Sequence, residues 1–285
     1  MIGFVLSGGA SLGAIQAGML KALYEHEIAP ELIVGTSAGA VNGAFIASRP
    51  PNVETAQGLI DIWLSLRTLE VFPPNPVTAV LGLLGKRDHL VPNTGLKKLL
   101  SDNLQFTRLE DAAIPIYVIA TDVLNGVERR LSKGDAESAV LASAAIPGVY
   151  PAIDFDGDVL VDGGVSDNTP ISDAANLNAT KIYVLPTGYP CALSAPPSGA
   201  IGMLVHAITL LINQRLVQDI EQFSHEAELI VLPPPCPDEV SAVDFSQARV
   251  LIEQSYKLAN DALDHPDPAR YATPTALERL RPHPH

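Results

Sequence analysis

Residues 33–47, IVGTSAGAVNGAFIA, carry the pattern from which the rest of the fold can be predicted. The apolar run at residues 32–34 predicts a buried strand, and residues 38–48, small and apolar on nearly every side, predict a buried helix. Gly35 and Gly39 leave room for the strand and the helix to cross closely, with Ser37 between them. Ser37 is therefore either a nucleophile on a sharp strand-to-helix turn or a serine that only caps the helix.

The segments around this stretch also alternate between strand and helix. Strands are expected at residues 2–6, 114–120, 127–131, 181–185 and 227–232, and helices at residues 13–26, 54–66, 135–145 and 246–263. Residues 149–155 and 159–161 predict a hairpin across Asp156-Gly157-Asp158. This alternation is typical of a mainly parallel sheet with helices on both faces. We expect an α/β fold, a three-layer α/β/α sandwich, in a single domain over residues 1–264.

Three segments depart from this pattern. Residues 67–100 mix prolines, glycines and leucines, and predict either a lid or binding segment or a surface loop with a short helix. The apolar residues between 204 and 223 repeat at helical spacing, and we expect that stripe to face the core. The Pro-rich tail, residues 265–285, is expected to be loosely ordered.

Composition and charge narrow the range of partners. The chain of 285 residues carries a net charge of −14 and no basic run, which argues against nucleic acid. Anionic headgroups repel an acidic surface, so any lipid contact should be apolar.

Cys191 and Cys236 lack metal-ligand spacing, so we expect free thiols and no metal site, with one disulfide as the alternative. The chain shows no signal peptide and no apolar run that could span a bilayer, so we expect a cytoplasmic protein. The sequence predicts no particular oligomeric state.

The glycine-rich loop SGGASLG, residues 7–13, lies between the first strand and the first helix. A dinucleotide fingerprint would need an acidic residue that closes the second strand, but Glu31 lies before that strand and the glycine spacing fits poorly. The same loop can instead stabilise a transient anion, because the N–H groups of Gly8, Gly9 and Ala10 can face the oxygen of a tetrahedral intermediate. The N–H group of Ala38, at the start of the helix after Ser37, is a further donor.

A serine hydroxyl needs a base before it can act as a nucleophile. The late histidines lie in an apolar stretch, after a helix or in the tail, and none has the context of a catalytic base: His206, His225, His265, His283 and His285. A buried carboxylate with a raised pKa is the other option. Asp162 directly follows the strand at residues 159–161, at a strand end where α/β sites assemble. Because Asp–Gly clusters also form ordinary turns, this motif alone leaves both interpretations open.

Taken in order, the motifs SGGASLG, GTSAG and DGG make the chain resemble the patatin-like phospholipase family, as do ASAAIPGVYPAI and DGGVSDNTP. The resemblance covers residues 2–185. It implies a patatin-like fold, a catalytic dyad of Ser37 and Asp162, and an oxyanion hole at the glycine loop. The residues that support these motifs are Gly13, Gly35, Gly39, Gly163, Gly164 and Asn168. The resemblance also implies hydrolysis of lipid acyl esters through an acyl-serine, without metal or cofactor. Peripheral contact with a membrane is expected with it.

Two positions of the glycine loop depart from the family pattern, which reads GGGARG or GGGxKG. Ala10 stands where the third glycine is usual, and Leu12 stands at the usual basic position. The loss of the cation removes a partner for a phosphate group, so ester hydrolysis carries over better than a preference for phospholipids. These departures motivate an alternative function, a catalytically weak regulatory or lipid-binding protein on the same fold.

Overall fold

The computed structural model describes residues 1–188, 196–197, 199–236 and 243–265. Within them, eight strands form one sheet in the order β5-β6-β3-β2-β1-β7-β8, with β4 paired to β3. The strands that pair in parallel are β1 (Ile2–Leu6), β2 (Leu32–Thr36), β3 (Ile116–Asp122), β7 (Lys181–Leu185) and β8 (Glu228–Val231). The antiparallel part of the sheet consists of β4 (Val127–Leu131), β5 (Ile153–Phe155) and β6 (Asp158–Asp162).

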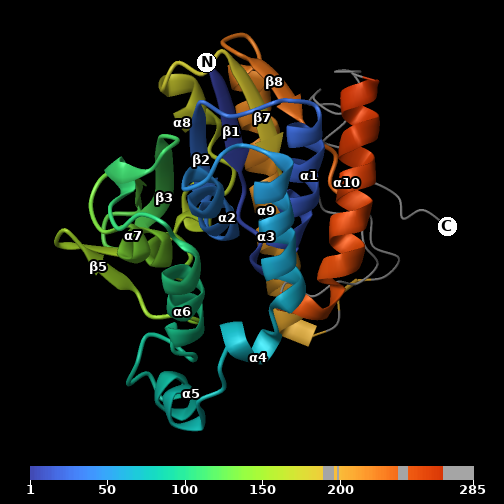
Figure 1. Cartoon of the computed structure of the whole chain (residues 1–285). Coiled ribbons are helices and arrows are strands. Elements are labelled where there is room, and N and C mark those ends of the chain that lie inside the picture. Colours follow the sequence, from blue (N-terminus) through green and yellow to red (C-terminus); the bar gives the residue numbers. More distant parts are fainter. Residues whose placement is uncertain (189–195, 198, 237–242, 266–285) are drawn as a thin grey trace.

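Helices cover both faces of this sheet (Figure 1). On one face lie α1 (Ala14–Glu25), α2 (Ala38–Ala47), α3 (Val53–Ser65), α7 (Ala136–Ser143) and α10 (Ala248–Asp264). On the other face lie α8 (Ile171–Asn176) and α9 (Gly199–Phe223). The predicted three-layer α/β/α sandwich with a mainly parallel sheet is therefore confirmed.

The two cores follow from the alternation of side chains along each strand. On β1, Phe4 and Leu6 belong to the core beneath α1 and α2, whereas Val5 belongs to the core beneath α8 and α9. Strands buried on both faces must be apolar at every position, which explains why the parallel strands are continuous apolar runs in the sequence.

The predicted hairpin is also confirmed, since β5 pairs with β6. Its turn has Asp156 at φ 54° and Gly157 at φ 88°. Positive φ at both central residues matches the right-handed twist of the two strands. The hairpin brings the end of β6, and thus Asp162, beside the parallel strand β3.

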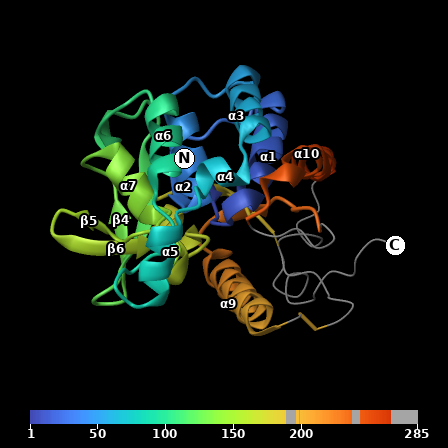
Figure 2. The same cartoon turned by 90° about the horizontal axis from the view of Figure 1, so that it is seen from below.

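Residues 67–100 fold mainly as short helices, and both expectations for this segment remain predictions. They contain α4 (Thr68–Val71), α5 (Pro76–Leu83) and the start of α6 (Thr94–Asn103). Asn75 caps α5 by accepting from the N–H group of Thr78. Figures 1 and 2 show α5 at the end of the molecule where the parallel strands finish.

The expectation that the apolar stripe of residues 204–223 faces the core is wrong for half of its length. Leu216, Ile220 and Phe223 are buried, but Leu204 is 61% exposed and Leu211 is 69% exposed. Helix α9, with 25 residues, is about 37 Å long, whereas a five-residue strand spans only about 17 Å. The helix therefore extends past the sheet that its C-terminal half covers.

Two further expectations concern the cysteines and the termini. Cys236 is disulfide-bonded, so the prediction of a free thiol is wrong there, and Cys191 lies outside the described residues. Of the expected tail, only His265 is described. None of the described helices combines the length and the hydrophobicity that a bilayer-spanning segment needs.

Candidate active site

Ser37 occupies the turn between β2 and α2 and is almost fully buried. Its backbone lies at φ 55° and ψ −121°, a conformation that costs free energy in a residue with a Cβ atom. The hydroxyl group makes no capping hydrogen bond to α2. It donates instead to Oδ2 of Asp162 at 2.6 Å. Of the two interpretations of Ser37, the geometry fits the sharp turn and not the helix cap.

Gly35 and Gly39 allow this turn to form. A Cβ atom on Gly39 would lie 2.1 Å from the carbonyl oxygen of Leu6, and one on Gly35 would lie 2.6 Å from the carbonyl oxygen of Gly39. Both contacts are with backbone atoms, which cannot move aside without disrupting β1 or α2. The strand and the helix cross at the distance that the two glycines permit, as the sequence predicted.

Asp162 ends β6, 125 residues after Ser37 in the sequence. Its Oδ1 atom accepts from the N–H group of Gly164 at 2.8 Å, and its side chain is buried. Burial raises the pKa of Asp162 to about 6, although the hydrogen bonds from Ser37 and Gly164 favour the charged form. The carboxylate is thus ionised at neutral pH yet basic enough to accept a proton. Gly163 packs against the carbonyl oxygen of Ile119, where a Cβ atom would lie 2.2 Å away.

The glycine loop passes over Ser37. A Cβ atom on Gly8 would lie 3.0 Å from Cβ of Ser37 and 2.5 Å from Oδ1 of Asn168. The carbonyl oxygen of Gly8 accepts from Oγ1 of Thr187 at 2.6 Å and from Nδ2 of Asn168 at 3.3 Å. Because a trans peptide directs its N–H group opposite to its carbonyl, these two donors fix the direction of the N–H group of Gly9.

The backbone N–H groups near Ser37 differ in whether they already donate a hydrogen bond within the protein. The N–H group of Gly8 donates to the carbonyl oxygen of Asn168 at 3.0 Å, so that donor is occupied. Among the residues that the structure describes, those of Gly9, Ala10 and Ala38 have no hydrogen-bond acceptor. Ala10 and Ala38 line the same pocket as Ser37. An oxyanion beside Ser37 would therefore find its donors at these three positions.

The two departures from the family motif have distinct structural consequences. Ala10 adopts φ 50°, a left-handed conformation that glycine would adopt without strain. Leu12 is partly buried and packs against the core beneath α1 and α2. At this position the loop thus has an apolar anchor in place of a cation. Gly13, the last residue of the loop, lies against Trp63 and Ala38, where a Cβ atom would come within 2.9 Å of each.

A buried polar network supports the loop from below. Nε2 of Gln16 donates to the carbonyl oxygens of Ser7 and Leu185, both at 2.9 Å. Nδ2 of Asn42 donates to Oε1 of Gln16 at 2.8 Å and to the carbonyl oxygen of Gly13, and Nε1 of Trp63 donates to Oδ1 of Asn42. The side-chain N–H and amide oxygen atoms of this network are satisfied, so it can hold the loop rigidly.

Sequence reasoning missed three of the positioning residues. Ser143 accepts from the N–H group of Ser37, Thr187 holds Gly8, and Gln16 holds Ser7. Thr187 follows the end of β7, beside β1, and that strand-end position is the signal that could have found it. Ser143 belongs to the quoted motif ASAAIPGVYPAI, in which nothing sets this serine apart from its neighbours. Gln16 looked like an ordinary helix residue.

An apolar pocket opens beside Ser37. One wall is a single face of α2, from Ser37 through Val41 to Phe45, which is about 12 Å long. The other walls include Ile62, Trp63, Phe72, Leu96, Leu99 and Tyr150. The pocket holds about 750 Å³ of space, counting the part open to solvent. It suits an apolar chain attached to a group at Ser37.

The sequence also raised a histidine base and a dinucleotide site as alternatives, and the described part of the chain supports neither. No described histidine lines the pocket, and His283 and His285 lie outside the described residues. Glu31 accepts from the N–H group of Ile2, at the opposite end of β2 from Ser37. The glycine loop therefore lacks the acidic residue that a dinucleotide site needs.

A serine at a strained strand-to-helix turn, hydrogen-bonded to a buried carboxylate beside an apolar pocket, has the strand–turn–helix context in which α/β hydrolases place a nucleophile. The family model for "Patatin-like phospholipase" matches residues 4–175, more than half of the chain, and the chain belongs to that family. The family assignment expected from the motifs is thereby confirmed.

Curated relatives agree with this assignment. Patatin-like phospholipase domain-containing protein 7 of Mus musculus is 28% identical over 196 residues, and the match covers 66% of this chain and 14% of that protein. Lysophospholipase NTE1 of Eremothecium gossypii is 31% identical over 194 residues, covering 66% and 12%. The chain thus spans about an eighth of the length of these relatives. Among solved structures, VipD from Legionella pneumophila is 14% identical with a TM-score of 0.48, covering 92% of this chain and 66% of that one.

Proposed function

We propose that this chain is a serine acyl hydrolase that cleaves lipid carboxylic esters with Ser37 as nucleophile and Asp162 as general base. The observation that carries the proposal is the 2.6 Å hydrogen bond from Oγ of Ser37 to Oδ2 of Asp162. That distance lies within the range expected of a nucleophile and its base. Family membership supports the same chemistry.

In the first half of the reaction, Oγ of Ser37 attacks the ester carbonyl carbon while its proton passes to Asp162. The carbonyl oxygen becomes an oxyanion, which accepts hydrogen bonds from the N–H groups of Gly9, Ala10 and Ala38. The N-terminal end of α2 favours the same negative charge. The intermediate then collapses, the C–O bond to the leaving alkoxide breaks, and Asp162 returns the proton to it. The acyl group stays on Ser37.

In the second half, Asp162 takes a proton from a water molecule as that water attacks the acyl carbon. The same three N–H groups stabilise the second oxyanion. When this intermediate collapses, the bond to Oγ of Ser37 breaks, and the proton on Asp162 returns to that oxygen. The free carboxylic acid leaves, and the residues are as they began. These steps use only residues of the chain and no metal or cofactor.

The pocket supports an acyl chain as the occupant. Its lining is almost wholly apolar, and Ser37 and Ala38 belong to it. Burying an apolar chain there is worth about 25 cal/mol for each Å² removed from water. An acyl ester would thus bind with its carbonyl at Ser37 and its chain along α2. With Leu12 at the usual basic position, carboxylic esters in general are the favoured substrates, and phospholipids are one class among them.

Peripheral contact with a membrane is part of the proposal. On α5, Val77, Val80 and Leu83 are more than half exposed, and Lys86 and Arg87 follow directly. The exposed half of α9 lies at the same end of the molecule (Figure 2). Val71 and Phe72, which precede α5, line the pocket. An acyl ester could therefore pass from a bilayer surface touched by α5 into the pocket.

The cytoplasmic location stays a prediction of the sequence. The disulfide at Cys236 argues against a cytoplasmic location, because the cytosol keeps thiols reduced.

The alternative function, a catalytically weak regulatory or lipid-binding protein, has one observation in its favour. Ala10 adopts a left-handed conformation that strains the loop carrying the proposed oxyanion donors.

A fluorophosphonate probe tests the nucleophile, because it forms a stable bond only with an activated serine. We expect mass spectrometry to find the adduct on Ser37 in the wild-type chain. The Ser37→Ala variant should give no adduct, and Asp162→Asn should label far more slowly. An unlabelled wild type would favour the binding protein, whereas equal labelling of wild type and Asp162→Asn would contradict the role of Asp162 as the base.

A further inference from the structure

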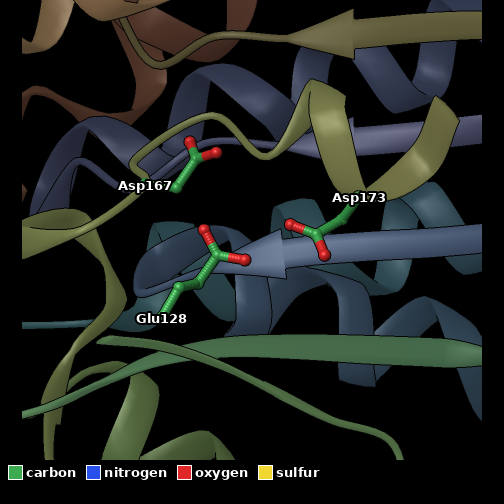
Figure 3. Close-up of side chains that lie close together, drawn as sticks. All are labelled: Glu128, Asp167 and Asp173. Atoms are coloured by element: carbon green, nitrogen blue, oxygen red, sulfur yellow. The ribbon is translucent and has the colours of Figure 1, made fainter. Parts of the chain in front are cut away.

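Three carboxylate side chains meet on the α8 side of the sheet, away from the acyl pocket. Glu128 comes from β4, Asp167 from the loop after Asp162, and Asp173 from α8. One oxygen atom of each lies within 4.8 Å of the others. Figure 3 shows the three carboxylates directed toward a common space. Asp167 and Asp173 are close in the sequence, whereas Glu128 precedes them by about 40 residues, and the sequence shows no ligand motif.

The charges around this cluster do not balance. Arg130 contacts Oδ1 of Asp173 at 3.0 Å. Arg215 pairs with Asp219 at 2.8 Å and lies 3.6 Å from Asp167. With all four carboxylates ionised, counting Asp219, the two guanidinium groups would leave two negative charges without a partner. A single divalent cation would supply that charge.

A second observation points to a ligand at this place. Asp173 is only 4% exposed, and its Oδ2 atom is buried without a hydrogen-bond partner among the described residues. A buried carboxylate oxygen without a partner is costly, and such atoms usually face a water or an ion. Glu128 is half-buried, and Arg130 beside it is exposed, so the cluster is reachable from solvent.

We propose that Glu128, Asp167 and Asp173 form a binding site for a hard divalent cation of the Ca²⁺, Mg²⁺ or Mn²⁺ type. Carboxylate oxygens are the ligands that these ions prefer, and water can fill the remaining positions. Arg130 occupies Oδ1 of Asp173 and leaves Oδ2 for the cation. The site is independent of the proposed hydrolase chemistry, in which the cation takes no part.

A bound proton is the competing way to satisfy the cluster. Burial, with Asp173 and Asp167 close by, raises the pKa of Glu128 to about 8. Burial, together with Asp219, raises the pKa of Asp167 to about 7, against the opposing effect of Arg215. A proton on Glu128 could be shared with Asp173, whereas a cation would replace it.

The cluster is linked to the proposed active site through one short loop. The carbonyl oxygen of Asp167 accepts from Oγ1 of Thr36, the residue before Ser37, at 3.0 Å. The next residue, Asn168, exchanges hydrogen bonds with Gly8. A cation at Asp167 would thus hold the loop that joins Asp162 to the oxyanion donors, and should stabilise the folded chain.

The experiment measures binding and stability of the whole chain after treatment with EDTA. CaCl₂, MgCl₂ and MnCl₂ are titrated separately by calorimetry, and Tm is recorded with and without each salt. We expect at least one cation to bind at one site and to raise Tm by several degrees. Glu128→Gln removes one charged ligand and should not respond to the cation.

Glu228→Gln is the matched control, since Glu228 is an exposed glutamate on β8 that pairs with Lys181. It should respond to the cation like wild type. Asp173→Asn should also lose the response, and circular dichroism shows whether it is folded. No cation binding by wild type at millimolar concentration would overturn the proposal in favour of the shared proton, and an unchanged response in Glu128→Gln would overturn it by placing the cation elsewhere. Neither result depends on ester hydrolysis, so failure here is distinct from failure of the proposed function.

Discussion

The hydroxyl oxygen of Ser143 accepts a hydrogen bond from the backbone N–H group of Ser37 at 2.8 Å, although 106 residues separate the two serines. The hydroxyl group of Ser143 donates in turn to the carbonyl oxygen of Ile119 at 2.5 Å. Ser143 thus ties the strained turn of Ser37 to strand β3. The left-handed backbone of Ser37 is held by this tertiary contact and not by the local sequence.

Ser143→Ala should therefore leave the buried N–H group of Ser37 without its partner and remove one hydrogen bond from the carbonyl oxygen of Ile119. We expect a loss of about 1–3 kcal/mol of stability. We also expect kcat for an ester substrate to fall about tenfold or more with little change in KM, because the pocket is untouched. Ser138→Ala, on the same helix but partly exposed, is the control and should behave like wild type. Equal kinetics for Ser143→Ala and wild type would show that the turn does not need this contact.

The pKa of Asp162 predicts a pH profile. If Asp162 is the base, kcat/KM should fall about tenfold for each pH unit below its pKa of about 6 and should level off above it. A rate profile from pH 4 to pH 9 measures this directly. A profile that stays flat through pH 5 would contradict the assignment.

The raised pKa of Asp162 also affects the stability of the fold, and for stability the protonated form is the favourable one. The folded-state pKa of about 6 lies above the ordinary aspartate pKa of 3.8, so this carboxyl group stabilises the fold when protonated. That stabilisation is complete below pH 4 and is lost as the pH rises through 6. At pH 8 the neutral Asp162→Asn variant should thus be more stable than wild type, by up to about 3 kcal/mol. Urea denaturation at pH 8 and pH 4 should show the difference only at pH 8.

The acyl pocket predicts a change of chain-length preference. Val41 lines the pocket one helical turn from Ser37. Val41→Phe should block the path along α2, so that hydrolysis of palmitate esters falls at least about tenfold relative to acetate esters. Val250→Phe, at a half-exposed site on α10, is the matched control. A parallel loss for acetate and palmitate would mean that the chain does not lie along α2.

If α5 contacts lipid, a charge on its apolar face should weaken binding to vesicles. Val80 is 54% exposed and Val250, on α10, is 47% exposed. A charge introduced at Val80 should prevent insertion of the apolar face, whereas the same charge at Val250 should not matter. We expect Val80→Asp to bind phosphatidylcholine vesicles at least about fivefold more weakly in a sedimentation assay, with Val250→Asp unchanged. Equal binding by the two variants would place the contact elsewhere.

The features that sequence reasoning predicted well are local ones. Strand, turn and helix around Ser37 lie within one short stretch, and the glycines that the crossing needs stand beside it. Asp162 could be proposed because it ends an apolar strand. Its closeness to Ser37 has a different cause from the one expected, since β6 runs antiparallel to β3 and places Asp162 opposite Ala120, next to the residue that pairs with Thr36.

What the sequence did not predict depends on contacts between distant segments. The stripe on α9 has the right period, but periodicity does not indicate where the sheet beneath it ends. Ser143 and Thr187 are ordinary residues, and the groups that they position, the N–H group of Ser37 and the carbonyl of Gly8, lie more than 100 positions away. Glu128, Asp167 and Asp173 meet only because β4, the loop after Asp162 and α8 converge.

Hydrolysis of p-nitrophenyl esters from acetate to palmitate by wild type, Ser37→Ala and Asp162→Asn separates a hydrolase from a binding protein in a single assay. We predict turnover by wild type and a loss of at least about a thousandfold in both variants, with circular dichroism spectra unchanged. A wild type that hydrolyses none of these esters, or a Ser37→Ala variant as active as wild type, would contradict the proposed role of Ser37. The turn at Ser37 would then belong to a protein that binds lipids without cleaving them.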